Sequence, residues 1–301
     1  MGKAMADPRR RHPENAPGPW FVDSTCIDCD LVRNLAPRLF AESLRDGLSY
    51  VARQPADPEE ALLAARGALA CPTGSVGGPL TRDVVERAYP WPIDGGSGVS
   101  RLGYASPDSF GAMSYLVERP QGNLMVDSPR WAAPVERALA ARGGLSKILL
   151  THRDDVADAG RYARRFAAEV WIHEDDADAA PGGVPLRTFR DEAEVQRGVL
   201  AIPTPGHTKG HSMYLVDDAS LFTGDSLFGS RIRRDLGAWK SVAWWSWERQ
   251  IESLARLARE HRFEWVLPAH GGAMRDTTEG MHARLLALVE RMRAGTEPGG
   301  W

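Results

Sequence analysis

Two short runs typical of β-strands lie beside loops that carry metal-type ligands, and this pattern constrains the fold more than any other feature of the chain. The segment Thr204–Ser212 reads TPGHTKGHS and leads into the run Met213–Val216, and the next run, Leu221–Gly224, ends at Asp225. Glycines within both loops allow sharp backbone turns. The imidazole of His207 and the carboxylate of Asp225 suit zinc, iron or manganese far better than calcium.

A third candidate ligand lies later in the chain. Residues Phe263–Leu267 have the composition of a buried strand, and the following segment, Pro268–Gly272, places His270 in a glycine-rich turn. A single histidine at a strand end is common in ordinary loops. Three ligand-type residues at three such positions favour a shared metal site.

The motifs that carry these residues, GHT at 206–208, TGD at 223–225 and PAHG at 268–271, resemble the later metal-binding motifs of the metallo-β-lactamase superfamily in order and spacing. The resemblance covers residues 95–295. It implies an α/β fold, the αββα sandwich, in which strand-end loops converge on one or two divalent metal ions (zinc, iron or manganese). The ligands that it implies are His152, Asp154, His207, Asp225 and His270.

The segment Thr151–Ala159 departs from the superfamily pattern. Members with full activity carry H-x-H-x-D-H here, whereas this chain reads THRDDVADA and is similar to a minor branch with T-H-R-D-D-V-A-D. In one register His152 is the first ligand, Asp154 replaces the second histidine, and Asp158 acts further along. In the other register two residues are deleted, so that Asp154 is the metal-activating aspartate and Asp155 replaces its histidine. The sequence leaves both registers open.

Either register makes the site richer in oxygen ligands. Carboxylates favour manganese or iron, while His207 and His270 keep zinc possible. The candidates for positioning the nucleophilic water are Asp154, Asp155 and Asp158. The alternative is a decayed site in which these aspartates only cap the next helix, where Asp is favoured.

A second motif lies near the N-terminus. Cys26 and Cys29 form a C-x-x-C run, and Cys71 follows at a distance, directly before Pro72. This pattern resembles a small bacterial ferredoxin that holds one iron–sulfur cluster. Val32 occupies the third position of the run and cannot ligate iron. The three thiolates could hold a 3Fe–4S cluster or an incomplete 4Fe–4S cluster with one foreign ligand, although three-iron ferredoxins usually lack the second cysteine of the run. An empty relic stays open.

The sequence divides into four segments. Residues 1–18 are charged and proline-rich and are expected to be a disordered leader. Residues 19–78 form the ferredoxin-like α+β domain, residues 79–98 a glycine- and proline-rich linker, and residues 99–298 the metallo-β-lactamase-fold domain. The net charge of −3 gives no reason to expect nucleic acid, and no run approaches the roughly 18 apolar residues of a membrane span. Three cysteines fit a reducing cytoplasm better than a disulfide scaffold.

Basic and aromatic residues are concentrated between Asp225 and the helix expected over residues 248–260. In the superfamily this region overhangs the metal cleft, so the resemblance implies that it shapes substrate choice. Arginines there could bind an anionic group, or the tryptophans could only seat the helix on the sandwich. The residues are Arg231, Arg233, Arg234, Trp239, Trp244, Trp245 and Trp247.

The resemblance implies a metal-dependent hydrolase of an ester- or thioester-type small molecule, in which the metal lowers the pKa of a bound water and polarises the scissile carbonyl. One alternative is an iron-dependent redox protein that the N-terminal cluster supplies with electrons, together with an electron-transfer partner. Another is a non-catalytic binding module. The superfamily spans thioesters, lactones, phosphoesters and oxygen chemistry, so the sequence does not indicate the substrate.

Overall fold

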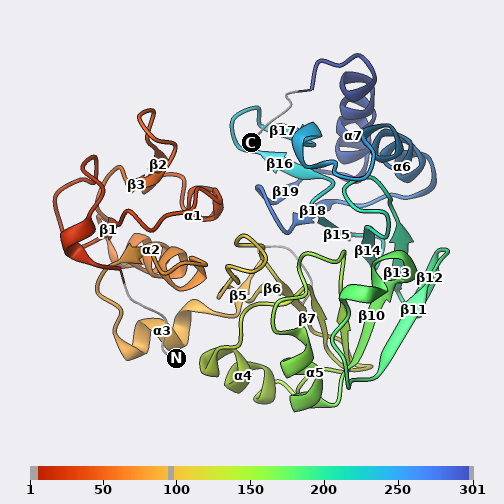
Figure 1. The fold of residues 1–301 in the computed structure, drawn as a ribbon, viewed down its shortest axis with the longest axis horizontal. Coiled ribbons are helices and arrows are strands. Elements are labelled where there is room, and N and C mark those ends of the chain that lie inside the picture. Colours follow the sequence, from red (N-terminus) through yellow and green to blue (C-terminus); the bar gives the residue numbers. More distant parts are fainter. Residues whose placement is uncertain (1–5, 94–97, 298–301) are drawn as a thin grey trace.

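A two-sheet sandwich flanked by helices, with a smaller α+β domain at one end, makes up the structure, a computed structural model that describes residues 6–93 and 98–297. Figure 1 shows the small domain, in red and orange, beside the β5 end of the sandwich. Residues 94–97 of the expected linker, the first five residues of the expected leader and residue 298 of the expected second domain lie outside the described residues.

The first sheet has seven strands in the order β11-β10-β9-β8-β7-β6-β5. β7 and β8 form an antiparallel hairpin, and β8 to β11 run parallel. The strands of this sheet are β5 (Trp91–Pro92), β6 (Val99–Arg101), β7 (Tyr115–Val117), β8 (Leu124–Val126), β9 (Lys147–Leu149), β10 (Glu169–His173) and β11 (Leu186–Phe189).

The second sheet has six strands in the order β12-β13-β14-β15-β18-β19, and only the β15–β18 pair is parallel. Its central strands are buried along their whole length, which suits near-continuous apolar runs. The strands are β12 (Ala193–Gln196), β13 (Val199–Pro203), β14 (Ser212–Val216), β15 (Ser220–Gly224), β18 (Trp265–Pro268) and β19 (Met274–Arg275). A short hairpin, β16 (Phe228–Ser230) and β17 (Asp235–Gly237), follows β15.

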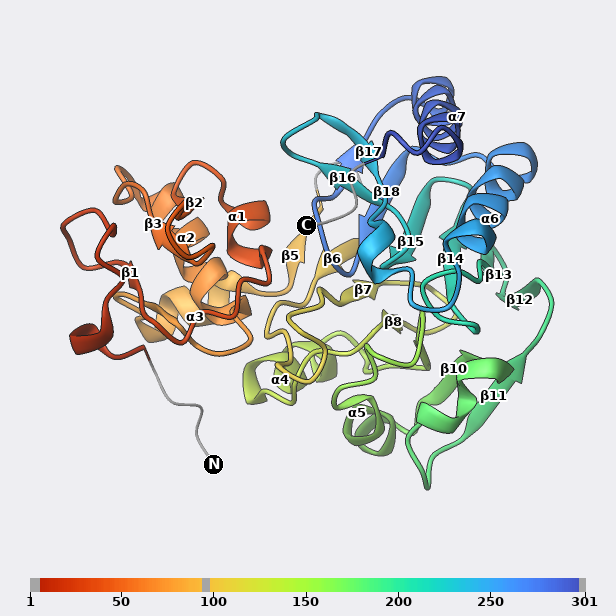
Figure 2. The ribbon, with the colours of Figure 1, turned by 45° about the horizontal axis from the view of Figure 1, so that its top comes forward.

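Helices cover the outer faces of both sheets, which gives the expected αββα order (Figure 2). One apolar core fills the space between the sheets, and a second lies between the second sheet and its helices. The helices are α4 (Ala133–Ala140) and α5 (Ala159–Phe166) on the first sheet, and α6 (Trp247–Glu260) and α7 (Thr278–Arg293) on the second. No helix within the described ranges is both long enough and apolar enough to cross a bilayer.

The small domain has a core of its own, built from residues such as Trp20, Val32 and Phe40. Its elements are a 3-10 turn η1 (Pro8–Arg10), β1 (Phe21–Val22), α1 (Leu31–Leu35), β2 (Phe40–Glu42), β3 (Ser49–Val51), α2 (Pro58–Ala70) and β4 (Val76–Gly77). The segment expected as a linker contains α3 (Arg82–Ala88) and β5. The Thr81 hydroxyl caps α3 by accepting the Val84 N–H at 3.4 Å, a start signal that the glycine and proline content obscured.

The expectation of a disordered leader is wrong for residues 6–18. His12 is buried, and its backbone N–H donates to the Val22 carbonyl at 2.8 Å. Asn15 joins three segments: its side-chain amide donates to His12 O at 2.7 Å and to Val22 O at 2.8 Å, and its side-chain carbonyl accepts the Val22 and Val51 N–H groups at 3.0 and 2.9 Å. These hydrogen bonds order a polar segment that composition alone assigns to disorder.

The Asn15 network predicts a measurable stability loss. Replacing Asn15 by Ala leaves two backbone N–H groups without an acceptor, which should cost about 1–3 kcal/mol of local stability. Hydrogen exchange at Val22 and Val51 measures this effect. The neighbouring Glu14 makes no side-chain hydrogen bond within the described part of the chain, so Glu14→Ala is the matched control. Equal exchange in both variants would contradict the assignment.

Candidate metal centre

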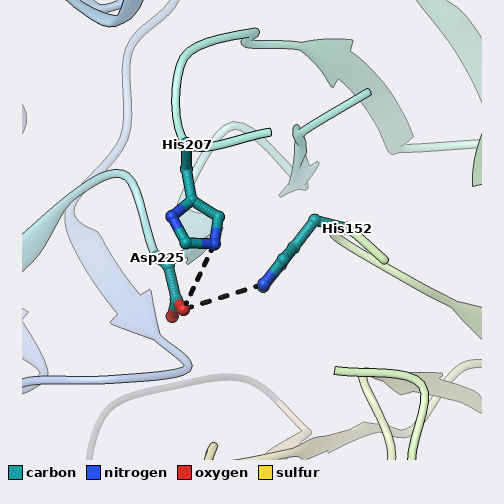
Figure 3. Close-up of side chains that lie close together, drawn as sticks. All are labelled: His152, His207 and Asp225. Atoms are coloured by element: carbon teal, nitrogen blue, oxygen red, sulfur yellow. Dashed lines mark ion pairs between the residues drawn. The ribbon is translucent and has the colours of Figure 1, made fainter. Parts of the chain in front are cut away.

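The ends of four strands bring the predicted ligands together between the two sheets. His152 follows β9, Asp225 follows β15 and His270 follows β18, while His207 lies in the loop between β13 and β14. The Oδ2 atom of Asp225 lies 3.7 Å from Nε2 of His152 and 3.7 Å from Nε2 of His207 (Figure 3). All three side chains are buried.

A second group of ligand atoms shares Asp225 with the first. In each group the ligand atoms all lie within 4.8 Å of one another: His152, His207 and Asp225 in one, and Asp155, Asp225 and His270 in the other. His270 Nδ1 lies 2.7 Å from Asp225 Oδ1, on the carboxylate oxygen opposite the one that faces His152. Asp225 therefore stands between two adjacent positions that could each take an ion.

The three aspartates after His152 separate into two that face the centre and one that does not. Asp154 Oδ2 lies 3.7 Å from His152 Nε2 and 3.6 Å from His207 Nε2. Asp155 Oδ2 lies 4.0 Å from His152 Nε2 and belongs to the second group. Asp154 therefore takes the place that the first register gives it, and Asp155 reaches the second position, so that neither register describes the site completely.

The structure places Asp158 outside both ligand groups. Its Oδ2 accepts the Trp131 backbone N–H at 2.6 Å, and the residue stands at the N-cap position of α5. Ala157 before it has a positive φ of 37°, which turns the chain away from the ligand loop. Asp158 thus anchors the start of a helix to a neighbouring loop.

Buried polar atoms show that the site fits a cation. The buried atoms that have no hydrogen-bond partner in the described part of the chain include four at this centre: Nε2 of His152, Nε2 of His207, Oδ2 of Asp154 and Oδ2 of Asp155. A buried polar atom without a partner costs free energy, and such atoms are rare in folded proteins. Ions that accept nitrogen and oxygen ligands would satisfy these four atoms together.

Hydrogen bonds on the far side of each histidine direct Nε2 into the site. The Nδ1–H of His207 donates to the Val242 carbonyl at 2.5 Å. The Nδ1–H of His152 donates to Thr151 Oγ1 at 2.9 Å, and that hydroxyl in turn donates to the Asp127 carboxylate at 3.0 Å. Such contacts fix the tautomer of a ligating imidazole. Asp127 itself belongs to neither ligand group.

His211 and Gly224 hold Asp225 in place. The Nδ1–H of His211 donates to Thr204 Oγ1 at 3.0 Å, and its Nε2 accepts the Asp225 backbone N–H at 3.3 Å. Burial, followed by the positive charge of His207, lowers the pKa of His211 to about 3, so the ring stays neutral. Gly224 has a φ of +50°, and a Cβ there would lie 2.5 Å from His211 Nε2. A glycine is therefore required at this turn.

The charges in the site are strongly coupled. Burial raises the pKa of Asp155, and the negative charge of Asp225 raises it further. Burial also lowers the pKa of His152. Burial opposes ionisation of Asp225, but the nearby positive charge of His270 and its hydrogen bond lower the pKa of that carboxyl. Burial thus favours the neutral forms of Asp155 and His152, while the contact with His270 keeps Asp225 ionised.

Sequence reasoning missed Asp176, which ties the two ligand loops to each other. This buried carboxylate accepts the Thr208 hydroxyl at 2.6 Å, the Gly210 N–H at 3.2 Å and the Arg153 N–H at 3.2 Å. It belongs to the 3-10 turn η2 (Glu174–Ala179) after β10, within the acidic run EDDAD. Such a run is typical of a solvated helix start, so no sequence signal separates Asp176 from its exposed neighbours.

The three cysteines of the small domain also come together. Cys26, Cys29 and Cys71 line one small cavity, and Val32 lines it as well. Burial raises the pKa of the Cys29 thiol to about 12. A Cβ on Gly111 would lie 3.0 Å from Cys29 Sγ, so the loop before β7 of the large domain packs directly on the cysteine cluster.

Comparison with known proteins finds similar proteins for both the small domain and the sandwich. Residues 22–78 match the family model described as the 4Fe-4S single cluster domain of Ferredoxin I. The hydroxyacylglutathione hydrolase of Bradyrhizobium sp. (strain ORS 278) is 31% identical over 201 residues, which are 64% of this chain and 76% of the relative. The chain belongs to the metallo-β-lactamase superfamily. The sandwich and its strand-end ligand loops are thus those of a superfamily member with an N-terminal ferredoxin-like domain.

Two further matches are more limited. The hydroxyacylglutathione hydrolase of Acidiphilium cryptum (strain JF-5) is 37% identical over 121 residues, so this superfamily member spans about half of that relative's length (49%) and aligns over 38% of its own. A crystal structure described as TTHA1623 in a di-iron-bound form aligns with a TM-score of 0.45 at 26% identity, over 58% of this chain and 93% of that one.

The shared position of Asp225 predicts how the superfamily member loses metal. We expect the purified protein to bind up to two equivalents of a divalent ion, and Asp225→Asn to lose most of both, since one carboxylate serves both groups. Asp158→Asn should keep wild-type stoichiometry. Elemental analysis after dialysis measures the content. Loss of metal in the Asp158 variant equal to that in the Asp225 variant would overturn the separation of the two residues.

Proposed function

We propose that the protein is a metal-dependent hydrolase of a small-molecule thioester or related ester. The observation that carries this proposal is the pair of ligand groups that share Asp225. Buried nitrogen and oxygen atoms around them have no hydrogen-bond partner. His152, Asp154, His207 and Asp225 would hold one ion, and Asp155, Asp225 and His270 the other. When bound, the ions would polarise the scissile carbonyl and lower the pKa of the attacking water.

Asp154 is the residue best placed to accept the proton of that water. Its side chain is 38% exposed, whereas those of His152, His207 and Asp225 are 0%, 1% and 10% exposed. It therefore faces the side from which water and substrate arrive, while its Oδ2 stays near both histidines. Asp155, fully buried behind it, orients the second position and does not meet solvent.

The ligand set favours hydrolysis of a carbonyl compound that has a good leaving group. Three carboxylates and three imidazoles carry more negative charge than a histidine-rich site, which favours manganese or iron over zinc and weakens the Lewis acid. A thiolate leaves more easily than an amine because its conjugate acid has a pKa near ~8.5. Thioester hydrolysis is also the chemistry in the names of the two relatives, the hydroxyacylglutathione hydrolases.

Metal reconstitution tests the proposal. Protein stripped of metal and reloaded separately with zinc, manganese or iron(II) should hydrolyse a simple thioester, fastest with manganese or iron, and a β-lactam reporter at least 100-fold more slowly. Asp154→Asn should lower kcat by about 100-fold or more if Asp154 takes the proton. Highest activity with zinc, or fast β-lactam turnover, would contradict this assignment. Lack of hydrolysis with every metal would overturn the hydrolase proposal.

A second candidate, an iron-dependent redox protein, is favoured by one contact. Gly111 packs on Cys29, and its neighbour Phe110 lies beside His270, with ring centroids 6.3 Å apart. Two consecutive residues, Phe110 and Gly111, therefore contact both the metal centre and the cysteine cluster. In this role the cluster would pass electrons from an external one-electron donor to iron held by the second group. The three reduced cysteines suit a reducing compartment such as the cytoplasm.

Spectroscopy separates the two candidates. We expect protein purified without oxygen to carry an iron–sulfur absorption band that Cys29→Ser removes. In a hydrolase, thioester turnover should be the same with the cluster oxidised and reduced. In a redox protein, reduction of the cluster should be followed by reduction of iron in the second centre, seen by electron paramagnetic resonance. Iron that stays oxidised after the cluster is reduced would exclude the redox candidate.

A further inference from the structure

Few aromatic side chains are exposed on the described part of the chain, and most of them lie beside the metal centre. Among residues 6–93 and 98–297, only Phe110, Trp244 and Trp245 are aromatic and more than a third exposed, at 42%, 64% and 44%. Two of the three lie against histidines of the metal centre: Trp244 is 4.6 Å from His207 and Phe110 is 6.3 Å from His270, measured between ring centroids. Aromatic surface left open to water beside a reactive centre needs an explanation.

Trp244 is held in this exposed position by a fixed loop. The Trp245 N–H donates to the His207 carbonyl at 3.1 Å, and the Ser246 N–H donates to the Gly206 carbonyl at 3.0 Å. The His207 ring donates to Val242 O on the other side of Trp244. The backbone on both sides of Trp244 is therefore bonded to the ligand loop. Its indole can meet a ligand without first losing much conformational freedom.

Phe110 is held on the other side of the centre, beside His270. It has a positive φ of 46°, an uncommon conformation for a bulky residue. The loop around it is fixed: the Gly111 N–H donates to Ser106 O at 2.9 Å, and the Met113 N–H donates to Ala269 O at 2.8 Å. Strained residues held by their surroundings are concentrated at functional sites. Here the strain leaves an apolar ring exposed next to a ligand.

Several cations around the ligand loops are paired with carboxylates of the chain. Of the arginines that the sequence singled out, Arg231 forms an ion pair with Asp30 at 2.9 Å and Arg233 one with Glu297 at 2.8 Å. Lys209, in the ligand loop, is paired with Asp175 at 2.8 Å. These cations are already neutralised by partners within the chain. Directly beside the histidines, the rim presents the aromatic rings of Trp244 and Phe110.

We propose that the substrate carries a flat or extended apolar group next to its scissile carbonyl, and that Trp244 and Phe110 bind this group. The proposal rests on the proposed thioester hydrolase function and names its substrate class: an aryl-alkyl or medium-chain alkyl thioester. The apolar group could belong to the acyl half or to the thiol half. Both have the same chemistry, and the experiment separates them.

The test measures selectivity within each variant, so that a general loss of activity cancels. In the acyl arm, phenylacetyl and acetyl thioesters of N-acetylcysteamine are compared. In the thiol arm, the acetyl thioesters of phenethyl thiol and of N-acetylcysteamine are compared. We expect kcat/KM to favour the apolar member at least 10-fold in one arm. Trp244→Ala should reduce that ratio about 5- to 10-fold, and Trp244→Phe should retain most of it.

Matched variants keep the test specific. Leu286 is 45% exposed on α7, away from the centre, so Leu286→Ala should keep the wild-type ratio. Phe110→Ala should lower the ratio as Trp244→Ala does. A ratio near one in both arms for the wild type, or a ratio that Trp244→Ala leaves unchanged, would overturn the proposal.

Failure of the hydrolase itself is distinguishable from failure of this inference. If no thioester is cleaved, binding of the uncleavable thioether analogues of the same pairs is followed by calorimetry. Tighter binding of the apolar analogue to the wild type, lost in Trp244→Ala, would keep the apolar site without the hydrolase. Equal binding of both analogues to the wild type would contradict the apolar site. Self-association of the wild type that Trp244→Ala abolishes would assign the aromatic residues to a protein interface and would also overturn the proposal.

Discussion

The carboxylate of Asp225 is the constraint on which the metal centre depends. One oxygen faces the two histidines that follow β9 and β13, and the other faces His270 after β18. It can do so only because β15 and β18 run parallel and end side by side, which places two ligand loops at one edge of the second sheet. The left-handed turn at Gly224 then directs the carboxylate inward, toward the loop that follows β9 of the first sheet.

Contacts between the sheets keep this edge closed. The Tyr115 hydroxyl on β7 donates to Pro268 O at 2.7 Å, two residues before His270. The Tyr214 hydroxyl on β14 donates to Leu150 O at 3.0 Å, two residues before His152. Each bond joins a strand of one sheet to a ligand loop of the other, so the spacing between ligands follows from the packing of the sandwich.

The sequence predicted the sandwich and the convergence of His152, His207, Asp225 and His270, because each of these residues lies in a loop next to an apolar run of strand length. It left open which of Asp154, Asp155 and Asp158 are ligands, since their positions depend on one backbone turn at Ala157. Asp176 gave no signal either, because its partners lie in two other loops. The order in residues 6–18 depends on long-range hydrogen bonds of Asn15, which composition does not report.

The burial of Val32 bears on whether the small domain would need an iron–sulfur cluster to complete its core. Many small metal-binding folds are unfolded until the metal supplies their missing core. Here Val32 packs with Trp20, Leu39 and Phe40 in an apolar core, while also lining the cysteine cavity. The domain further rests on the sandwich through Leu31 and Ala70, which belong to the large core. A cluster would therefore bind beside an apolar core that other residues already build, rather than supply the core itself.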